Sequence, residues 1–136
     1  MFNLFPNFSI LLLIKKKNAM GKAIDKNSAP HYFWGDNCSS WILANRESLS
    51  VKFETMPGKT KETPHYHSSS WQFFYMLKGS AVFYIDGELE LVGEQQGILI
   101  EPMSKHFIIN ESADPIDFLL ISQPNNATYN DRTDVE

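Results

Sequence analysis

The stretch HYHSSSWQFFYMLKG, residues 65–79, places two of the four histidines of the chain one residue apart and puts a glutamine inside an apolar run. Alternate side chains of a β-strand point to the same face, so His65 and His67 are expected to share one face. After the turn at the three serines the chain returns, and Gln72 can reach the same point from the neighbouring strand. The stretch therefore predicts a polar cluster between two strands.

The rest of the chain from about residue 34 has the same texture of short apolar runs separated by turn signals. Asp86-Gly87 is a strong hairpin signal after one such run, and no segment sustains a helical period with capping residues. Regularly spaced short strands are typical of a single all-β sandwich or barrel. The expected strands cover residues 49–56, 71–77, 80–85, 97–101, 106–110 and 116–122.

Strand alternation also predicts which side chains line the interior. Taking the apolar positions as inward, we expect the interior walls to include Val51, Phe53, Phe74 and Met76. The opposite face of the 71–77 strand is also apolar, which indicates that a second sheet layer, an N-terminal strand or another subunit covers it. We expect a homodimer, with Phe73, Tyr75 and Leu77 on the covered face.

A metal site is the functional interpretation of the histidines. Two imidazoles on one strand face lie about 6.6 Å apart along the strand, close enough to converge on one ion. His106, at the start of a later expected strand, could supply a third nitrogen, and Asn110 lies two steps further on the same face. The alternative is that these histidines are hydrogen-bonded core residues without a ligand.

Composition excludes several classes of protein. The chain has 136 residues, 43% of them hydrophobic, and a formal charge of −4, so it can form one domain with a core but has no basic surface that would indicate nucleic-acid binding. Its one cysteine, Cys38, excludes an internal disulfide and favours a reducing compartment, so we expect a cytoplasmic protein. We interpret Cys38 as a small apolar core residue.

The N-terminal segment SILLLIKKK, residues 9–17, is too short to span a membrane, and its lysines follow the apolar run, the reverse of a secretory signal. We expect no membrane association. Residues 1–25 are predicted to be a poorly ordered extension, and residues 26–136 to form the barrel domain.

Two motifs in this sequence resemble those of the cupin superfamily. Gly58, His65-x-His67, Gln72 and Gly79 follow the order of the first cupin motif, and Gly97, Pro102, His106 and Asn110 follow the second. Some spacers differ by one residue, and Gln72 stands where most metal-binding cupins have glutamate. The resemblance covers residues 34 to 124 and is closest to small single-domain cupins. It implies a cupin-type barrel (a double-stranded β-helix or jelly roll), often dimeric, with a divalent metal in its mouth.

Carried over residue by residue, the resemblance implies that His65, His67, Gln72 and His106 hold one divalent ion, which could be Zn, Fe, Mn or Ni. A neutral amide in place of a carboxylate leaves the site with the full charge of the ion. Such an ion is a stronger Lewis acid and attracts anionic ligands. This favours isomerisation, ring opening or cyclisation of a small polar or anionic molecule over oxygenation.

The sequence does not decide whether the protein is an enzyme. The alternative to a metal-dependent enzyme is a non-catalytic cupin that binds or senses a small ligand. Glu101, Lys105 and Tyr84 are the candidate acid or base groups near the expected mouth, and each is also an ordinary surface residue. The substrate and the metal are not specified by the residue pattern.

Overall fold

The computed structural model describes residues 21–127 and 130–136 and contains only β-strands as regular secondary structure in these ranges. Alternating apolar residues and frequent turn residues explain why strands form rather than helices. The strands are β1 (His31–Trp34), β2 (Cys38–Arg46), β3 (Leu49–Met56), β4 (Thr60–Lys61), β5 (His65–Tyr66), β6 (Trp71–Lys78), β7 (Ala81–Ile85), β8 (Glu88–Val92), β9 (Gly97–Ile100), β10 (His106–Asn110), β11 (Ile116–Gln123) and β12 (Thr133–Asp134).

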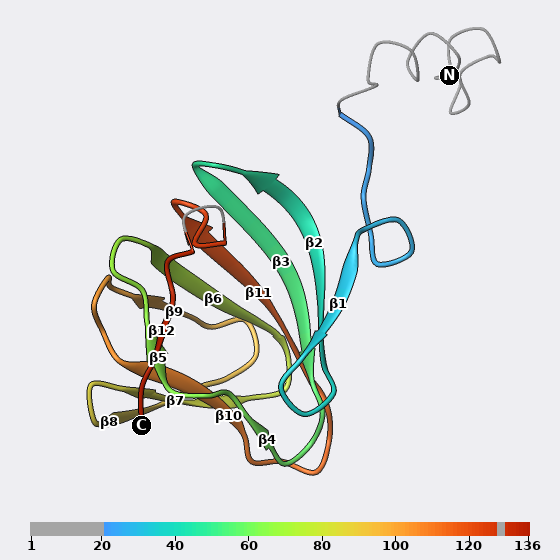
Figure 1. Cartoon of the computed structure of the whole chain (residues 1–136). Helices are drawn as coiled ribbons and strands as arrows, with labels where there is room; N and C mark the ends of the chain where they lie inside the picture. The colour runs from blue at the N-terminus through green and yellow to red at the C-terminus, as the bar shows by residue number, and fades with distance from the viewer. Residues whose placement is uncertain (1–20, 128–129) are drawn as a thin grey trace, which may run out of the picture.

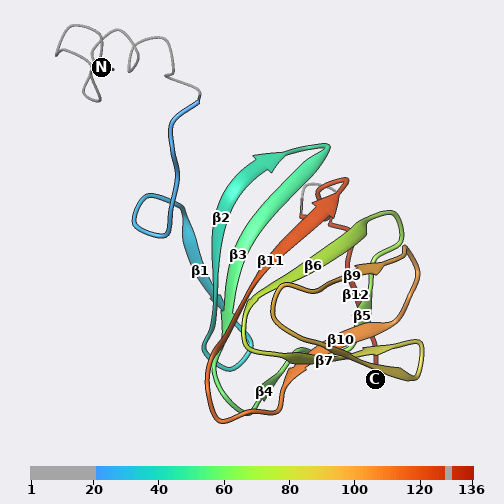
Figure 2. The ribbon, with the colours of Figure 1, turned by 180° about the vertical axis from the view of Figure 1, so that it is seen from behind.

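The strands form two antiparallel sheets that face each other (Figures 1 and 2). One has the order β1-β2-β3-β11-β6-β9 and the other β12-β5-β10-β7-β8, with β4 paired to β10. Several neighbouring strands, such as β3 and β11 in one sheet and β5 and β10 in the other, are distant in sequence, which is typical of a jelly roll. The predicted all-β barrel is thus confirmed.

The described part of the chain contains no helix of the length and apolarity needed to cross a membrane. The segment 1–20 lies outside the described residues, so the division at residue 25 stays a prediction. Near that boundary, the Lys26 ammonium lies 4.8 Å from the ring centroid of Trp41 and 4.3 Å from that of Phe53. This contact attaches the segment around Lys26 to the outer face of the first sheet.

The core lies between the sheets and is built from three buried phenylalanines. The ring of Phe74 on β6 packs 5.0 Å from Phe83 on β7 and 5.7 Å from Phe118 on β11, so these contacts join both sheets. Each fully buried ring contributes about 1.5–3 kcal/mol from its removal from water. The inward direction predicted for Phe74 and Met76 is confirmed, and Cys38 is fully buried as expected.

The predicted direction of β3 is wrong. Ser50, Glu54 and Met56 are its buried residues, whereas Val51 and Phe53 lie half-buried on the outer face. Phe53 pairs with Trp41 and packs against it there, with ring centroids 5.8 Å apart. The reason is that the barrel interior beside β3 is a polar site, so the polar side of the alternation turns inward and the apolar side is covered from outside.

The end of the barrel away from the histidines is closed by Asn110. Its Nδ2 lies 2.8–3.1 Å from the carbonyl oxygens of Met56, Pro57 and Asp114. Asn110 therefore has a structural role at the end of β10, where it satisfies these carbonyl groups, rather than a role in ligand binding.

Candidate metal site

Three histidines converge inside the barrel. His65 begins β5, His67 follows that strand, and His106 begins β10, where it pairs directly with His65. One ligand atom from each ring lies within 4.8 Å of the others, and the ring centroids of His65 and His106 are 4.4 Å apart. The arrangement brings together the three histidines that the sequence singled out, while His31 lies elsewhere on β1.

Hydrogen bonds to the backbone define the tautomer of all three rings. The Nδ1 atoms of His65 and His106 each lie 2.8 Å from a backbone carbonyl oxygen, and Nδ1 of His67 bonds to the carbonyl of Asp131. A carbonyl only accepts, so each Nδ1 carries the proton and each Nε2 presents its lone pair. The Nε2 of His67 is buried and has no hydrogen-bond partner among the described residues.

Gln72 completes the cluster from β6. Its Nε2 donates to Ser122 Oγ over 3.2 Å, and this orients Oε1 toward His106, whose Nε2 is 3.1 Å away. Because the proton of His106 is on Nδ1, the lone pair of its Nε2 faces a lone pair of Gln72 Oε1 across this short distance. The contact becomes favourable when a cation lies between them.

Asp131 supports the site from the C-terminal segment. Its carboxylate accepts hydrogen bonds from the backbone N–H groups of Ser68, Ser69 and Ser70 at 2.6–2.9 Å, while its carbonyl holds His67. Burial alone would raise the pKa of Asp131, but these N–H groups lower it below the ordinary value. The serine turn and the ring of His67 are therefore fixed by one residue from the other end of the chain, which sequence spacing does not reveal.

Burial keeps the imidazoles neutral. It is the largest cause that lowers the pKa of His65 to about 3 and that of His106 to about 4, and the pKa of His67 is lowered for the same reason. Neutral imidazole is the form that binds metals. The three imidazoles of the folded, metal-free chain are therefore already in the neutral form that binds a metal ion.

Metal affinity is expected to stay nearly constant from pH 7 to pH 5.5. With ordinary histidine pKa values near 6.5, protons would compete with the ion and weaken three-histidine binding by roughly several hundredfold over this range. Since burial lowers the pKa values of His65 and His106 to about 3 and 4, the loss should occur mainly below pH 4. Titration with Co²⁺ at a series of pH values measures this, and a steep loss centred at pH 6.5 would contradict it.

His65, His67 and Gln72 line a pocket of about 280 Å³ that also contains acidic and basic groups not identified from the sequence. Burial raises the pKa of Glu54 to about 7 and that of Glu62 to about 8, although Lys52 lowers the first and Arg132 lowers the second. All four residues line the same pocket. The sequence did show that Lys52 and Glu54 lie on the same face of β3. That face was assigned to the surface because its residues are polar, and so the two pocket residues were missed.

The acid or base candidates chosen from the sequence are wrong in position. Glu101 and Lys105 are exposed, and Tyr84 stacks on Phe107 with ring centroids 4.7 Å apart. None of the three lines the pocket of the histidines. Glu101 and Lys105 were chosen as sequence neighbours of His106, but closeness in sequence does not place a side chain on the same face of a strand.

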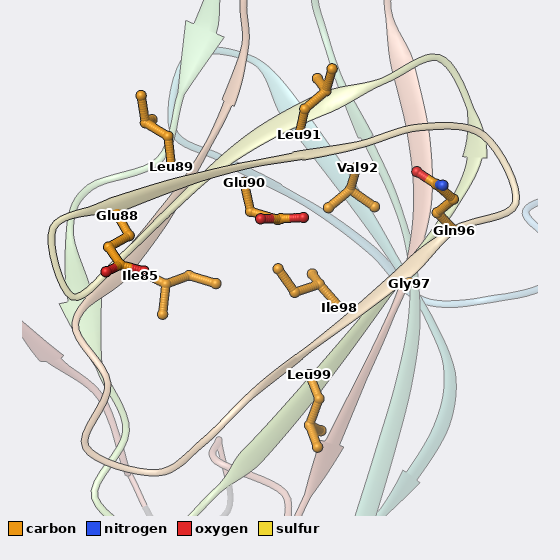
Figure 3. A pocket seen from close by; sticks show the side chains of 10 residues that line it. All are labelled: Ile85, Glu88, Leu89, Glu90, Leu91, Val92, Gln96, Gly97, Ile98 and Leu99. Carbon is orange, nitrogen blue, oxygen red and sulfur yellow. The ribbon is translucent and has the colours of Figure 1, made fainter.

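A larger cavity, about 700 Å³, lies between the edge strands β8 and β9 (Figure 3). Ile85, Glu90, Val92 and Ile98 point into this opening, whereas Leu99 points away from it. Its lining contains no histidine and no group of candidate metal ligands. Size alone therefore does not identify a candidate metal site, since most of the candidate ligands line the smaller pocket.

The residues present fit a divalent metal ion. Three Nε2 lone pairs and one amide oxygen converge, and the unpartnered Nε2 of His67 and the facing lone pairs of His106 and Gln72 both lack a positive partner. Imidazole nitrogens and an amide oxygen accept Zn²⁺, Fe²⁺, Mn²⁺ or Ni²⁺, so the donor set does not select one of them.

The fold and this site define a class of protein: a small jelly-roll domain with a three-histidine cluster inside the barrel. The family model described as "Cupin domain" matches residues 51–122, just over half of the chain. The chain therefore belongs to the cupin family, in which a bound metal is common. A search of curated proteins returned no significant match.

Many solved structures share the fold. A sugar phosphate isomerase of the cupin superfamily from Silicibacter pomeroyi is 18% identical with a TM-score of 0.67, and the match covers 76% of each chain. KdgF from a Halomonas species is 14% identical with a TM-score of 0.71, over 79% of this chain and 99% of that one. The polyketide cyclase RemF from Streptomyces resistomycificus is 16% identical with a TM-score of 0.66, over 76% and 80%. At these identities the comparisons show the fold.

Proposed function

We propose that this cupin is a metal-dependent enzyme in which His65, His67, His106 and Gln72 hold one divalent ion and a small polar or anionic molecule reacts beside it. The observation that carries the proposal is the common orientation of the three imidazoles. Each has its Nδ1 proton tied to a backbone carbonyl, and one ligand atom from each lies within 4.8 Å of the others.

The neutral donor set favours polarising chemistry. When bound, the ion would act as a Lewis acid on an oxygen of the substrate, with its full charge retained because Gln72 adds none. Isomerisation, ring opening or cyclisation therefore fit the site better than oxygenation. The similar folds of a sugar phosphate isomerase and a polyketide cyclase support this range of reactions.

The surrounding residues supply binding and proton transfer. Glu54 and Glu62 have raised pKa values near neutrality, the range in which a carboxyl group can both donate and accept a proton. Leu120 and Trp34 line the same pocket and reduce its contact with water. These groups provide the acid and base functions that a bound ion alone lacks.

Elemental analysis of the purified protein tests the proposal, followed by titration of chelator-treated protein with Zn²⁺, Fe²⁺, Mn²⁺ and Ni²⁺. We expect one equivalent of a divalent metal per chain. Failure of every ion to bind would overturn the enzyme proposal, and a non-catalytic ligand-binding cupin would replace it.

We also propose that the protein is a homodimer, formed through the outer face of the sheet that contains β6. On this face Trp71 is 45% exposed, Phe73 36%, Leu77 40% and Leu99 50%. Contiguous apolar side chains on one sheet face are typical of a protein–protein contact. Cytoplasmic location stays a prediction from the single cysteine.

Phe73→Asp should convert the dimer to a monomer at micromolar concentration, because it places a charge at the centre of the apolar face. Analytical ultracentrifugation measures the change. Phe33→Asp is the matched control, since Phe33 is 70% exposed on β1 at the far edge of the same sheet. Wild-type protein that sediments as a monomer, or a dimer that survives Phe73→Asp, would contradict the proposal.

A further inference from the structure

Lys52 is a lysine on the inner face of the barrel wall. It pairs with Leu120 on β11, which in turn pairs with the core residue Phe74 on β6. Directly paired residues of adjacent strands point to the same face, so Lys52 points inward with them. Ser122 pairs with Ser50 on one side and with Gln72 on the other, so these three residues lie side by side across the sheet. Lys52 is the next inward-facing residue of β3 after Ser50, and it therefore lies beside the residues that flank Gln72.

The charge of Lys52 has no ion-pair partner in the described parts of the chain. Its ammonium lies 5.4 Å from the ring centroid of Tyr32, which holds it by a cation–π contact among the pocket-lining residues. The nearby Glu54 does not neutralise it fully, since burial raises the pKa of that carboxyl to about 7.

The other cation of the pocket is already compensated. Arg132 Nε donates to Asp134 Oδ1 over 2.8 Å, so a carboxylate already balances its charge. Lys52 is therefore the group on this wall with positive charge left for a ligand. Lys52 is half-buried, so a ligand anion that enters the pocket can reach its ammonium group and form a charge-assisted hydrogen bond with it.

Resting on the function proposed above, we propose that the substrate is a small hydroxy carboxylic acid whose carboxylate binds Lys52 while the rest of the molecule reaches the histidine cluster. The pocket volume of about 280 Å³ lies just below the range of about 300–1,000 Å³ for drug-sized ligands, which fits a molecule this small. Buried acceptors without partners, Asn126 Oδ1 and Glu62 Oε1, are suited to hydroxyl groups on the same ligand.

A carboxylate matches the charge of this wall better than a phosphate. One uncompensated ammonium balances one negative charge, whereas a phosphate monoester carries about −1.5 to −2 at pH 7. Arg132, the other cation of the pocket, is already paired with Asp134 and so offers no second positive charge for a phosphate. Both anions could contact Lys52, so an experiment must compare them.

The test uses metal-free full-length protein with ¹³C-labelled lysine, titrated with glycolate and separately with inorganic phosphate while NMR follows the lysine side chains. Lys52→Met assigns the Lys52 signal by its loss. We expect glycolate to shift that signal saturably and to bind more tightly than phosphate. The exposed Lys61 lines no part of this pocket and is the internal control. The variants lack this signal, so their glycolate affinity is measured by calorimetric titration: binding should weaken at least about tenfold in Lys52→Met, the loss of one charge-assisted hydrogen bond, and remain in Lys52→Arg.

Metal titration of the same variants separates this inference from the proposed function. Lys52→Met should leave metal affinity unchanged, since Lys52 is not among the proposed ligands. An unshifted Lys52 signal, equal glycolate affinity in Lys52→Met, or tighter binding of phosphate would each overturn the carboxylate subsite, whatever the metal titration shows. A protein that binds glycolate through Lys52 but no metal would retain the subsite and lose the enzyme proposal.

Discussion

Replacing His106 with alanine is expected to weaken metal binding by more than about 100-fold, because loss even of a partner that only orients a metal ligand costs 10–100-fold. His106 is central to the cluster: its ring centroid lies 4.4 Å from that of His65 and 5.7 Å from that of His67, and its Nε2 faces Gln72. Without it, two imidazoles and one neutral amide remain. Isothermal titration with Zn²⁺ measures the loss.

Two further variants keep this experiment interpretable. His106 is only 2% exposed, so alanine could leave a destabilising cavity, and His106→Gln retains most of the volume and a polar end group. His31→Ala removes a histidine whose ring packs against Phe33 and Trp41 away from the cluster, and it should bind metal as the wild type does. If folded His106→Ala and His106→Gln bind Zn²⁺ with wild-type affinity, the site assignment is wrong.

The sequence was most informative where local geometry and residue type agree. The alternation in 65–79 places His65 and His67 on one face, and the structure brings His106 to them because β5 and β10 pair at these residues. The apolar runs also located β3, β6, β7, β9, β10 and β11, where turns are marked by residues such as Asp86 and Gly87, whereas the other six strands lie outside the predicted ranges. Register across sheets did not have to be known for these conclusions.

The predictions from sequence failed where polar side chains are buried and apolar side chains lie on the outer face. In β3 the rule that apolar side chains turn inward failed, because the barrel interior at this position holds the polar pocket and Lys26 and Trp41 cover Phe53 from outside. The acids of the pocket were missed for the same reason. Glu54 looks like the solvent face of an amphipathic strand until its cross-strand partner Phe118 is known to be buried.

Long-range contacts were the other source of error. Asp131 lies 64 residues after His67 and orients it through a backbone carbonyl, while its side chain binds the serine turn. No residue type or spacing marks such a contact, since any residue offers a carbonyl. The donor atoms of a site are therefore more predictable than the groups that hold them in place.

Replacing Gln72 with glutamate is expected to tighten metal binding by roughly 10–100-fold, the range over which changes in the groups around a metal ion alter its affinity. The substitution keeps the size of the side chain and changes the charge of the donor set from 0 to −1, which strengthens its attraction to a divalent ion. Ser122 can donate its hydroxyl proton to the new carboxylate, so the orienting contact at 3.2 Å is retained with its direction reversed. Competition titration against a chelator measures the gain.

The gain in metal affinity from Gln72→Glu should also depend on pH. A negative charge added elsewhere on the protein would not show this dependence. Position 72 is 3% exposed, so a carboxyl group there would be protonated in the metal-free protein and must lose its proton when the ion binds. The advantage of Gln72→Glu should therefore grow as pH rises from 5 to 8, and in Co²⁺-loaded protein the pKa of any water on the ion should rise because the ion is less electrophilic. Gln95→Glu, at an exposed position, adds the same charge elsewhere and should change neither quantity. Unchanged affinity in Gln72→Glu at every pH would show that Gln72 is not a ligand, and the site would then be a three-histidine centre with Gln72 as a neighbour.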